Sequence, residues 1–131
     1  MIKQKKKALV FAGSRGIGKA IANALKEIPL LEVDALSSKD LDTSNLEECV
    51  ELCDSYQSVD IIVLNTGGPP AKPFSDITLD DWNKYHNQLF LGFALILQKM
   101  KINDRGFIFL ISSYNIKEPD SNLILSNTYR I

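Results

Sequence analysis

The sequence predicts an α/β domain with a doubly wound parallel sheet, arranged as three layers of helices, sheet and helices. The prediction rests on short, continuously apolar runs that alternate with segments of helical periodicity along the whole chain. Such runs are typical of strands buried on both faces, and strand–helix alternation is typical of a parallel sheet. A glycine-rich turn also joins the first apolar run to the first helical segment. Because the connections are short, we expect right-handed crossovers between the strands.

The first strand is expected at residues 7–11, where a short apolar run is closed by glycine. A helix is expected at residues 16–28, because apolar residues recur there three and four positions apart and Pro29 follows. Residues 31–37 alternate between apolar and polar side chains, which predicts the second strand.

The middle of the chain predicts a helix, a strand and a loop. The helix follows Ser44, which is the expected N-cap, and Glu47 three residues later would complete a capping box. Residues 59–65 carry the strongest buried-strand pattern in the chain. Residues 66–73 must form a loop, since three prolines and two glycines exclude a regular element there.

The last third of the chain predicts a long helix, a strand and a short final helix. The long helix is expected at residues 79–100, opened by Thr78 and by two aspartates near its positive end. Residues 106–112 form another apolar run of strand length, and the final helix is expected near Leu123. No internal repeat or linker interrupts the pattern, so residues 1–131 are expected to form one domain.

The composition is that of an ordinary globular domain, with 45% hydrophobic and 24% charged residues. A net charge of −1 argues against a nucleic-acid-binding surface, which needs a clustered basic excess. The most apolar segment, residues 89–97, is too short to span a bilayer, so no membrane partner is expected. No apolar segment of signal-peptide length follows the N-terminal lysines, and a cytoplasmic location is therefore expected.

The cysteines and the histidine do not predict a metal site. Cys49 and Cys53 are four residues apart, on one face of the expected helix, and His86 is the only histidine. These three side chains fall short of a four-ligand zinc site. Both cysteines are expected to be buried, reduced, apolar residues.

The glycine-rich turn is the first candidate functional site. Gly13, Gly16 and Gly18 enclose Ser14 and Arg15, directly before the first expected helix. One interpretation is packing, because a tight turn from strand to helix needs residues without a Cβ. The other is a phosphate site, because the backbone N–H groups at a helix N-terminus are unsatisfied and the helix dipole favours an anion there.

Three motifs occur in an order and spacing that resemble the short-chain dehydrogenase/reductase family: "SRGIGKAIA", "LNTGG" and "GFIFLISS". The resemblance covers residues 8–130 and is closest to 3-oxoacyl-(acyl-carrier-protein) reductase-like members with an "NTGGPP" loop. It implies a Rossmann fold and an NAD(P)-dependent oxidoreductase that reduces a small carbonyl substrate. It further implies that residues 1–131 end after the fifth strand of the family's sheet, without the C-terminal part of the family fold.

The resemblance implies a cofactor site built from the glycine turn, the end of the second strand and the loop after the third. The residues implied are Gly13, Ser14, Arg15, Gly16, Ile17, Gly18, Ser37, Ser38, Lys39, Asp42, Asn65, Thr66 and Gly67. The turn departs from the family pattern, because Phe11 and Ala12 stand where the family has threonine and its first glycine. Asp42 matches the acidic residue that meets the adenine in family members, and the helix that normally lies before it is missing here.

The cofactor implied is NADP, with NAD less favoured. In the family, a basic residue at the position of Arg15 accompanies NADP and can pair with its 2′-phosphate. The second strand ends in Ser37, Ser38 and Lys39, without the acidic residue that NAD sites use to hold a ribose 2′-hydroxyl. The alternative is that Arg15 and Lys39 are simply exposed surface residues.

The family's catalytic set is only partly present. Ser113 matches the catalytic serine, whereas Ser126 stands at the tyrosine position and Arg130 at the lysine position. Leu89 stands at the position of the family's asparagine, and Tyr129 lies off the register of the catalytic tyrosine. A serine hydroxyl is too weakly acidic to replace a phenol as proton donor. The alternatives to an impaired reductase are a non-catalytic nucleotide-binding or scaffold module and a truncated, inactive fragment.

The expected long helix also predicts self-association. Its residues 89–97 are apolar on nearly all sides, which is more than one face of a sheet can cover. Family members pair this helix across a dimer interface, so the resemblance implies a homo-oligomer formed through it.

Overall fold

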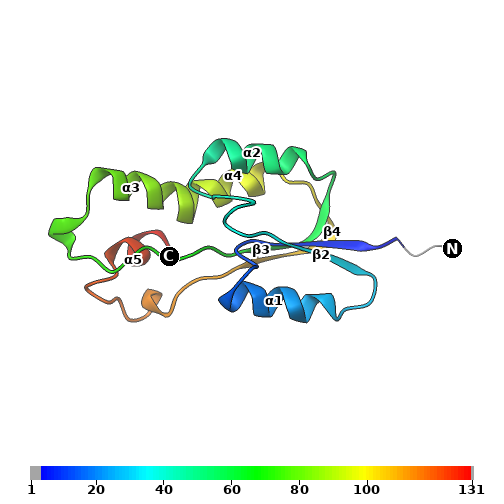
Figure 1. Ribbon diagram of the computed structural model, residues 1–131, viewed down its shortest axis with the longest axis horizontal. Coiled ribbons are helices and arrows are strands. Elements are labelled where there is room, and N and C mark those ends of the chain that lie inside the picture. The colour runs from blue at the N-terminus through cyan, green and yellow to red at the C-terminus, as the bar shows by residue number, and fades with distance from the viewer. Residues whose placement is uncertain (1–3, 131) are drawn as a thin grey trace.

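The computed structural model describes residues 4–130 and shows a four-stranded parallel sheet with helices on both faces (Figure 1). The strands are β1 (Lys6–Val10), β2 (Leu31–Ala35), β3 (Val59–Leu64) and β4 (Ile102–Leu110). They lie in the order β2-β1-β3-β4, and every neighbouring pair is parallel. The order reverses direction between β1 and β3, which is the point where ligands bind in sheets of this type. The predicted doubly wound α/β fold is confirmed.

The count of strands differs from the one that the family resemblance implies. The described residues contain four strands, so β4 is the fourth strand and not the fifth. The segment between β2 and β3 is short and holds only a polar turn and one helix.

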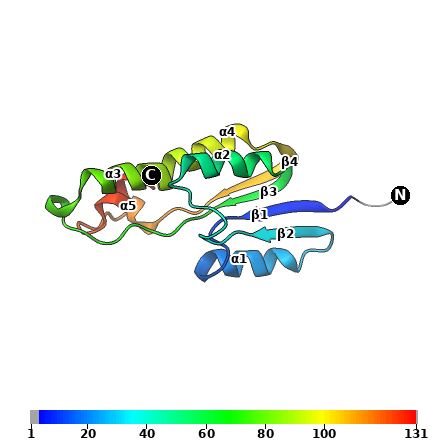
Figure 2. The same ribbon diagram turned by 45° about the horizontal axis from the view of Figure 1, so that its top comes forward.

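The helices cover the two faces unequally, as two views show (Figures 1 and 2). Helix α1 lies on one face, α2 and α4 lie on the other, and α3 and α5 lie side by side beyond the sheet. The α-helices are α1 (Gly16–Lys26), α2 (Leu46–Asp54), α3 (Leu79–His86), α4 (Gly92–Lys99) and α5 (Ile124–Tyr129). Two 3₁₀ turns are η1 (Phe74–Asp76) and η3 (Tyr114–Ile116), and a π-helical turn, η2 (Asn87–Leu91), joins α3 to α4.

The core against the sheet forms two clusters, because successive strand residues point to opposite faces. Leu9 and Ile62 face α2 and α4, together with Phe11, whose ring stacks on that of Phe93 at 6.4 Å. Val10 and Val63 face α1. Burial of a side chain of this size stabilises the fold by about 1.5–3 kcal/mol.

Of the two expected helix N-caps, the one at Thr78 is confirmed and the one at Ser44 is wrong. Helix α2 is capped by Asn45, whose side-chain oxygen accepts the Glu48 N–H, and not by Ser44. The Ser44 hydroxyl instead donates to Asp42 at 2.7 Å, and this local bond removes it from the capping position. The predicted helix at 79–100 is confirmed, and Thr78 opens it with a complete capping box.

The outer strand β4 carries apolar side chains that helices do not cover. Phe107 and Phe109 are exposed and stacked on the α1 side at 6.1 Å, because they pair with β3 residues that face α1. Ile108 and Leu110 are exposed on the opposite side. Their exposed fractions run from 48% to 61%, which is unusual for a strand of a parallel sheet. This exposed surface of β4 is a site where another chain can associate.

We therefore expect the chain to self-associate at micromolar concentration, and we expect Phe109→Lys to reduce that association. The charge would oppose the burial of β4 against a second apolar surface. Light scattering across a concentration series measures the effect. Leu79→Lys is the matched control, because Leu79 is a single exposed apolar residue on α3. A monodisperse monomer formed by the unmodified chain would contradict the prediction.

A second prediction concerns acid stability. The Lys72 ammonium, at 2.7 Å, and the N–H and hydroxyl of Thr78 lower the pKa of Asp81 from 3.8 to about 2. Because the pKa is lower in the folded state, Asp81 stabilises the fold above about pH 3.8, and this contribution is lost as pH falls through about 2.

The variant Asp81→Asn should therefore be less stable than wild type at neutral pH and should converge on it as pH falls. Denaturant titrations at several pH values between neutrality and about pH 2 measure this convergence. Asp80→Asn serves as the control, because Asp80 lies in the same helical turn but is not part of the ion pair between Lys72 and Asp81. Parallel stability profiles for Asp81→Asn and wild type would exclude the predicted linkage.

Candidate functional site

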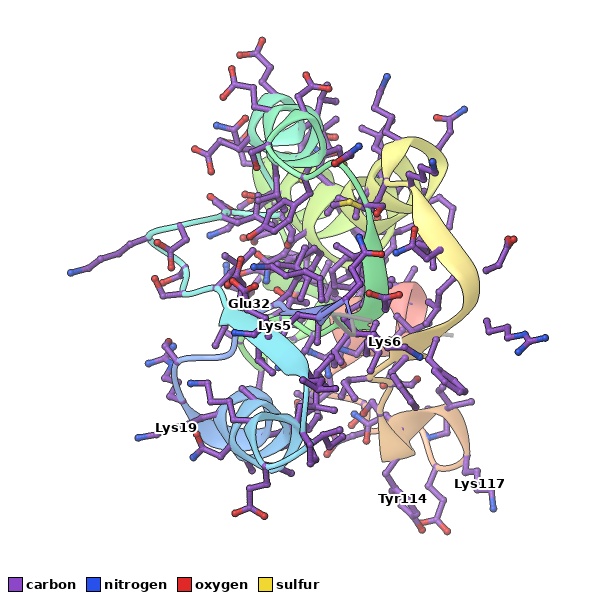
Figure 3. All side chains as sticks on the ribbon, turned by 90° about the vertical axis from the view of Figure 1, so that its right-hand side faces the viewer. Lys5, Lys6, Lys19, Glu32, Tyr114 and Lys117 are labelled. Carbon is purple, nitrogen blue, oxygen red and sulfur yellow. The ribbon has the colours of Figure 1, made fainter. Side chains whose placement is uncertain are left out.

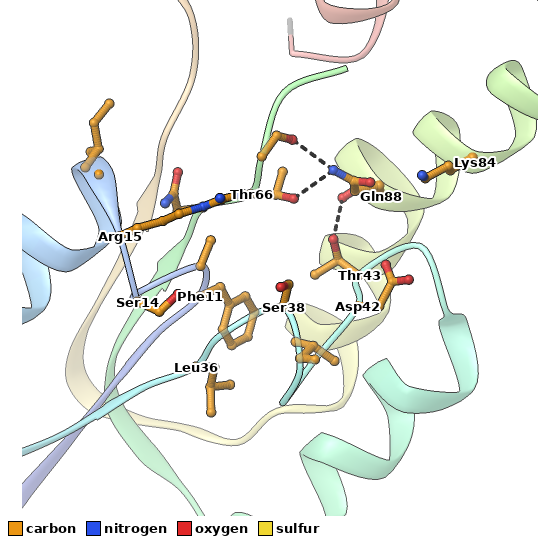
Figure 4. Close-up of a pocket in the computed structure, with 16 residues that line it drawn as sticks. Phe11, Ser14, Arg15, Leu36, Ser38, Asp42, Thr43, Thr66, Lys84 and Gln88 are labelled. Carbon is orange, nitrogen blue, oxygen red and sulfur yellow. Dashed lines mark hydrogen bonds between the residues drawn. The ribbon is translucent and has the colours of Figure 1, made fainter. Parts of the chain in front are cut away.

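A pocket of about 530 Å³ lies at the carboxyl ends of β1, β2 and β3, beside the start of α1 (Figure 4). This volume falls in the range of small-ligand and cofactor sites. The predicted cofactor residues that line it are Ser14, Arg15, Gly16, Ile17, Ser38, Asp42, Asn65, Thr66 and Gly67. The structure thus brings three separate loops of the chain to one pocket. The remaining four, Gly13, Gly18, Ser37 and Lys39, are not among its lining residues.

The glycines of the turn have different roles. Gly16 has φ +56°, in the left-handed region, and a Cβ there would meet nothing within 4 Å. At Gly18 a Cβ would lie 2.0 Å from the Ala12 carbonyl oxygen, and at Gly13 it would lie 2.9 Å from the Cβ of Ala35. Gly13 and Gly18 therefore serve packing, whereas Gly16 shapes the open edge of the pocket. The packing interpretation of the glycine turn is therefore confirmed for Gly13 and Gly18.

The start of α1 is suited to an anion. Arg15 is the N-cap residue and lines the pocket, and the first helical turn carries no carboxylate. The free N–H groups and the dipole of an eleven-residue helix both favour negative charge at this end. The Arg15 guanidinium adds a formal positive charge beside them.

Ala12 has a backbone conformation that favours glycine. Its φ is +48°, and it stands at the position where the family resemblance has the first glycine of the turn. A left-handed alanine costs about 1–2 kcal/mol. The turn therefore adopts at Ala12 a backbone conformation that suits glycine, although alanine stands there.

The end of β2 contributes Ser38 but not Ser37 or Lys39. The N–H and hydroxyl of Ser37 donate to the Asp40 carboxylate at 2.7 and 2.8 Å, and these bonds lower the pKa of Asp40. The Ser37 oxygen also accepts the Lys39 N–H. An acidic residue thus follows β2, contrary to the expectation, but Asp40 is bound to Ser37 and is not part of the pocket lining.

Gln88 is a pocket residue that the sequence did not reveal. Its side-chain nitrogen donates to the Thr66 hydroxyl at 3.0 Å and to the Gly67 carbonyl at 2.8 Å, and it ties the loop after β3 to the long helix (Figure 4). The backbone carbonyl of Gln88 accepts a hydrogen bond from the Thr43 hydroxyl at 3.0 Å. The Gly67 carbonyl can only accept a hydrogen bond, so the side-chain amide of Gln88 must point its nitrogen, and not its oxygen, toward Gly67.

Leu89, which aligns with the family's asparagine, points away from the pocket. It is buried with Tyr85 and Leu125, between α3 and α5. The π-helical turn starts at Asn87 and shifts the register of the helix, so that Gln88 faces the pocket instead. Apolar periodicity does not report such a shift.

The three predicted catalytic residues lie outside the pocket lining. Ser113 is the N-cap of η3, and its hydroxyl oxygen accepts the Asn115 N–H at 3.3 Å. Ser126 is buried on α5, with 6% of its surface exposed. Only Arg130 reaches a residue of the pocket wall, because its Nη2 donates to the Thr66 carbonyl at 3.4 Å.

Tyr129 faces α3, as its register predicted. Its hydroxyl donates to the Trp82 carbonyl at 3.4 Å, and its ring packs edge-on against Trp82 and His86. The phenol is therefore held on the side of the domain formed by α3 and α5.

Both cysteines are buried on α2, as predicted. Burial raises the pKa of Cys49 to about 11, which keeps its thiol protonated at neutral pH. Within residues 4–130, no group of three or more histidine, cysteine, aspartate or glutamate side chains could hold a metal ion. None of the helices in the same part of the chain combines the length and the apolar character needed to cross a membrane.

The fold is that of short-chain dehydrogenases. The chain is similar to a crystal structure of a small-chain dehydrogenase, with TM-score 0.86 and 21% identity over 97% of this chain and 70% of that one. A small-chain dehydrogenase in complex with NADPH matches with TM-score 0.84 and 21% identity, over 97% of this chain and 59% of that one. A short-chain dehydrogenase from Burkholderia cenocepacia J2315 in complex with NADP matches with TM-score 0.80 and 24% identity, over 97% and 63%.

These structures are longer than the present chain, which spans between 59% and 70% of their length. No family model matches the sequence, and no curated protein matches it. The likeness therefore concerns the fold.

A prediction follows from the backbone of the turn: Ala12→Gly should stabilise the protein by up to about 1 kcal/mol. Glycine relieves the left-handed strain, at about 1–2 kcal/mol, but costs about 0.5–1 kcal/mol of chain entropy. Urea denaturation measures the difference. Ala20→Gly on the exposed side of α1 is the control and should destabilise by about 1 kcal/mol. A loss of stability in Ala12→Gly would show that the turn does not strain this residue.

Proposed function

We propose that this chain binds NADP in the pocket beside α1 and derives from a carbonyl-reducing oxidoreductase. The observation that carries the proposal is the start of α1, where free backbone N–H groups and Arg15 face a pocket of about 530 Å³ at the switch point of the sheet. Two of the similar structures are complexes with NADPH or NADP. This supports the same cofactor here.

The residues present fit a dinucleotide. Gly16 and Gly67 leave open space where side chains would stand, so backbone can approach a ligand closely at both ends of the pocket. The N–H groups of α1 would hold the pyrophosphate, and Arg15 with Ser38 would meet the 2′-phosphate. Lys39 lies outside the pocket lining, so it supports the 2′-phosphate site less than Arg15 does. Asp42 would meet the adenine.

The loop after β3 would face the opposite half of the cofactor. Asn65, Thr66 and Gly67 line the pocket, and Gln88 fixes the loop through two hydrogen bonds. Bound NADPH would supply a hydride to a carbonyl carbon. The residues of this loop would exclude water and orient the group that carries the hydride.

The catalytic residues support at most feeble turnover. Ser113 could hold a carbonyl oxygen by a hydrogen bond, but Ser126 is buried and lacks the acidity of a phenol. Arg130 could stabilise negative charge but does not release a proton. The burial of Ser126 therefore favours the second candidate, a nucleotide-binding or scaffold module that retains the fold without the chemistry.

Three further parts of the proposal concern the subfamily, the cellular location and the oligomeric state. The 3-oxoacyl-(acyl-carrier-protein) reductase-like branch is supported by the "NTGGPP" loop, and the cytoplasmic location by the sequence alone. A homo-oligomer through the long helix is supported by an exposed apolar stripe of Phe90, Ala94 and Leu97, spaced four and three residues apart.

The cofactor proposal predicts that NADPH binds more tightly than NADH. A charge-assisted bond to the 2′-phosphate contributes about 1.5–3 kcal/mol, which corresponds to roughly 10- to 100-fold in affinity. Calorimetric titration of both cofactors measures the preference, and Arg15→Ala should reduce it. Lys117→Ala is the control, because Lys117 projects outward from the end of η3 (Figure 3). Equal affinities, or an unchanged preference in Arg15→Ala, would exclude the assignment.

The catalytic residues predict little or no oxidation of NADPH with a panel of keto and acyl substrates. The double variant Ser126→Tyr with Arg130→Lys should not restore turnover, because Ser126 is buried and lies outside the pocket lining. The absorbance of NADPH measures both. Robust turnover by the unmodified chain would show that other residues supply the proton.

A further inference from the structure

Arg130 is a half-buried cation without an acidic partner among the described residues. The ion pairs within residues 4–130 join Lys7 to Glu32 and Asp34, and Lys72 to Asp81. The Nε atom of Arg130 is fully buried and makes no hydrogen bond in this part of the chain. Burial lowers the pKa of Arg130, and no carboxylate of residues 4–130 acts against this shift.

The main chain of Arg130 is held firmly beside the pocket. Its N–H donates to the Ser126 carbonyl at 3.1 Å, and its carbonyl accepts the Ser112 hydroxyl at 2.8 Å. These bonds fix the end of α5 against the segment that follows β4. They therefore hold the backbone of Arg130 beside the pocket wall.

The guanidinium lies against the loop that forms the pocket wall. Its Nη2 is 3.4 Å from the Thr66 carbonyl, and a Cβ added to Gly68 would lie 3.3 Å from the same nitrogen. Thr66 and its neighbour Gly67 line the pocket. Arg130 thus lies beside the pocket wall, at the end of the pocket where β3 finishes.

One long hydrogen bond to a neutral carbonyl does not offset the burial of a guanidinium. Removing this charge from water costs several kcal/mol unless an anion and further hydrogen bonds compensate it. The planar fork of arginine matches carboxylate and phosphate groups, which accept two parallel N–H bonds. An oxyanion is therefore the ligand chemistry that would compensate the charge of Arg130.

We propose that Arg130 binds an oxyanion of a ligand that occupies the adjoining pocket, with Thr66 and Gly68 shaping the space beside its guanidinium. The inference rests on the proposed function for the nature of the ligand. The oxyanion has two sources, a carboxylate on the carbonyl substrate or a phosphate of the dinucleotide. The first would make the substrate class an oxo acid.

The direct test is the ¹⁵N-edited NMR signal of the Arg130 Nε–H in the unmodified chain, assigned by its loss in Arg130→Gln. The probes are 2-oxobutanoate, the uncharged 2-butanone of the same carbon skeleton, and NADPH. We expect 2-oxobutanoate, added with or without NADPH, to shift the signal while 2-butanone does not. A shift with NADPH alone, unchanged by 2-oxobutanoate, would assign the oxyanion to the dinucleotide. No shift with either anion would overturn the proposal.

Calorimetry on variants gives a second readout. One of the two anions is expected to shift the NMR signal, and Arg130→Gln should lower the affinity for that anion by about tenfold or more. Arg130→Lys should restore part of the affinity that Arg130→Gln removes. Lys117→Gln removes one charge from the surface and should leave the affinity unchanged. Equal affinities for Arg130→Gln and wild type would overturn the proposal. If 2-oxobutanoate binds through Arg130 but NADPH does not bind at all, the Arg130 proposal stands and the cofactor proposal fails. The failure of one proposal can therefore be told from the failure of the other.

Discussion

The arrangement of the pocket depends on one close contact, between the start of α1 and the turn that precedes it. Gly18 approaches the Ala12 carbonyl so closely that a Cβ would lie 2.0 Å from its oxygen and 2.8 Å from the side-chain nitrogen of Asn65. A side chain at this position would push α1 away from the ends of β1 and β3. The Gly13 N–H, which donates to the Leu36 carbonyl at 2.8 Å, ties the same turn to β2. The pocket exists because three strand ends and one helix meet at this turn.

The same constraint explains why the two sides of the sheet differ. The strands β1 and β3 are central and buried, since helices cover both their faces. The outer strand β4 continues the apolar pattern through Phe107 to Leu110, but α1 lies over β1 and β2 and leaves it uncovered. Edge strands usually carry charges that discourage pairing, as Glu32 and Asp34 do on β2. The residues of β4 are those of a core strand at an edge position.

Most of the fold could be predicted from the sequence because continuous apolar runs and helical periodicity report burial directly. The exact pocket could not. The π-helical turn that turns Gln88 inward adds one residue to a helix whose apolar pattern continues on both sides of it. Likewise, Ser44 and Asn45 are both good N-cap residues, and the choice between them depends on Asp42, which binds Ser44. Ser37 was expected at the cofactor site, but Asp40 three residues later binds it. Each difference comes from a local hydrogen bond or a single-residue shift.

Cofactor binding and catalysis place different demands on the chain, and this explains why one is better supported than the other. The proposed pyrophosphate site would be built from backbone N–H groups, so Ala12 could stand in place of a glycine as long as its φ stays near +48°. Proton transfer depends on the chemical identity and exposure of single side chains, which backbone geometry cannot supply. Ser126, at the position that the resemblance gives to the tyrosine, is buried on α5, while Arg130 four residues later keeps a charge beside the pocket wall. A fold of this kind could therefore keep a nucleotide site and a cation next to it without keeping the proton donor.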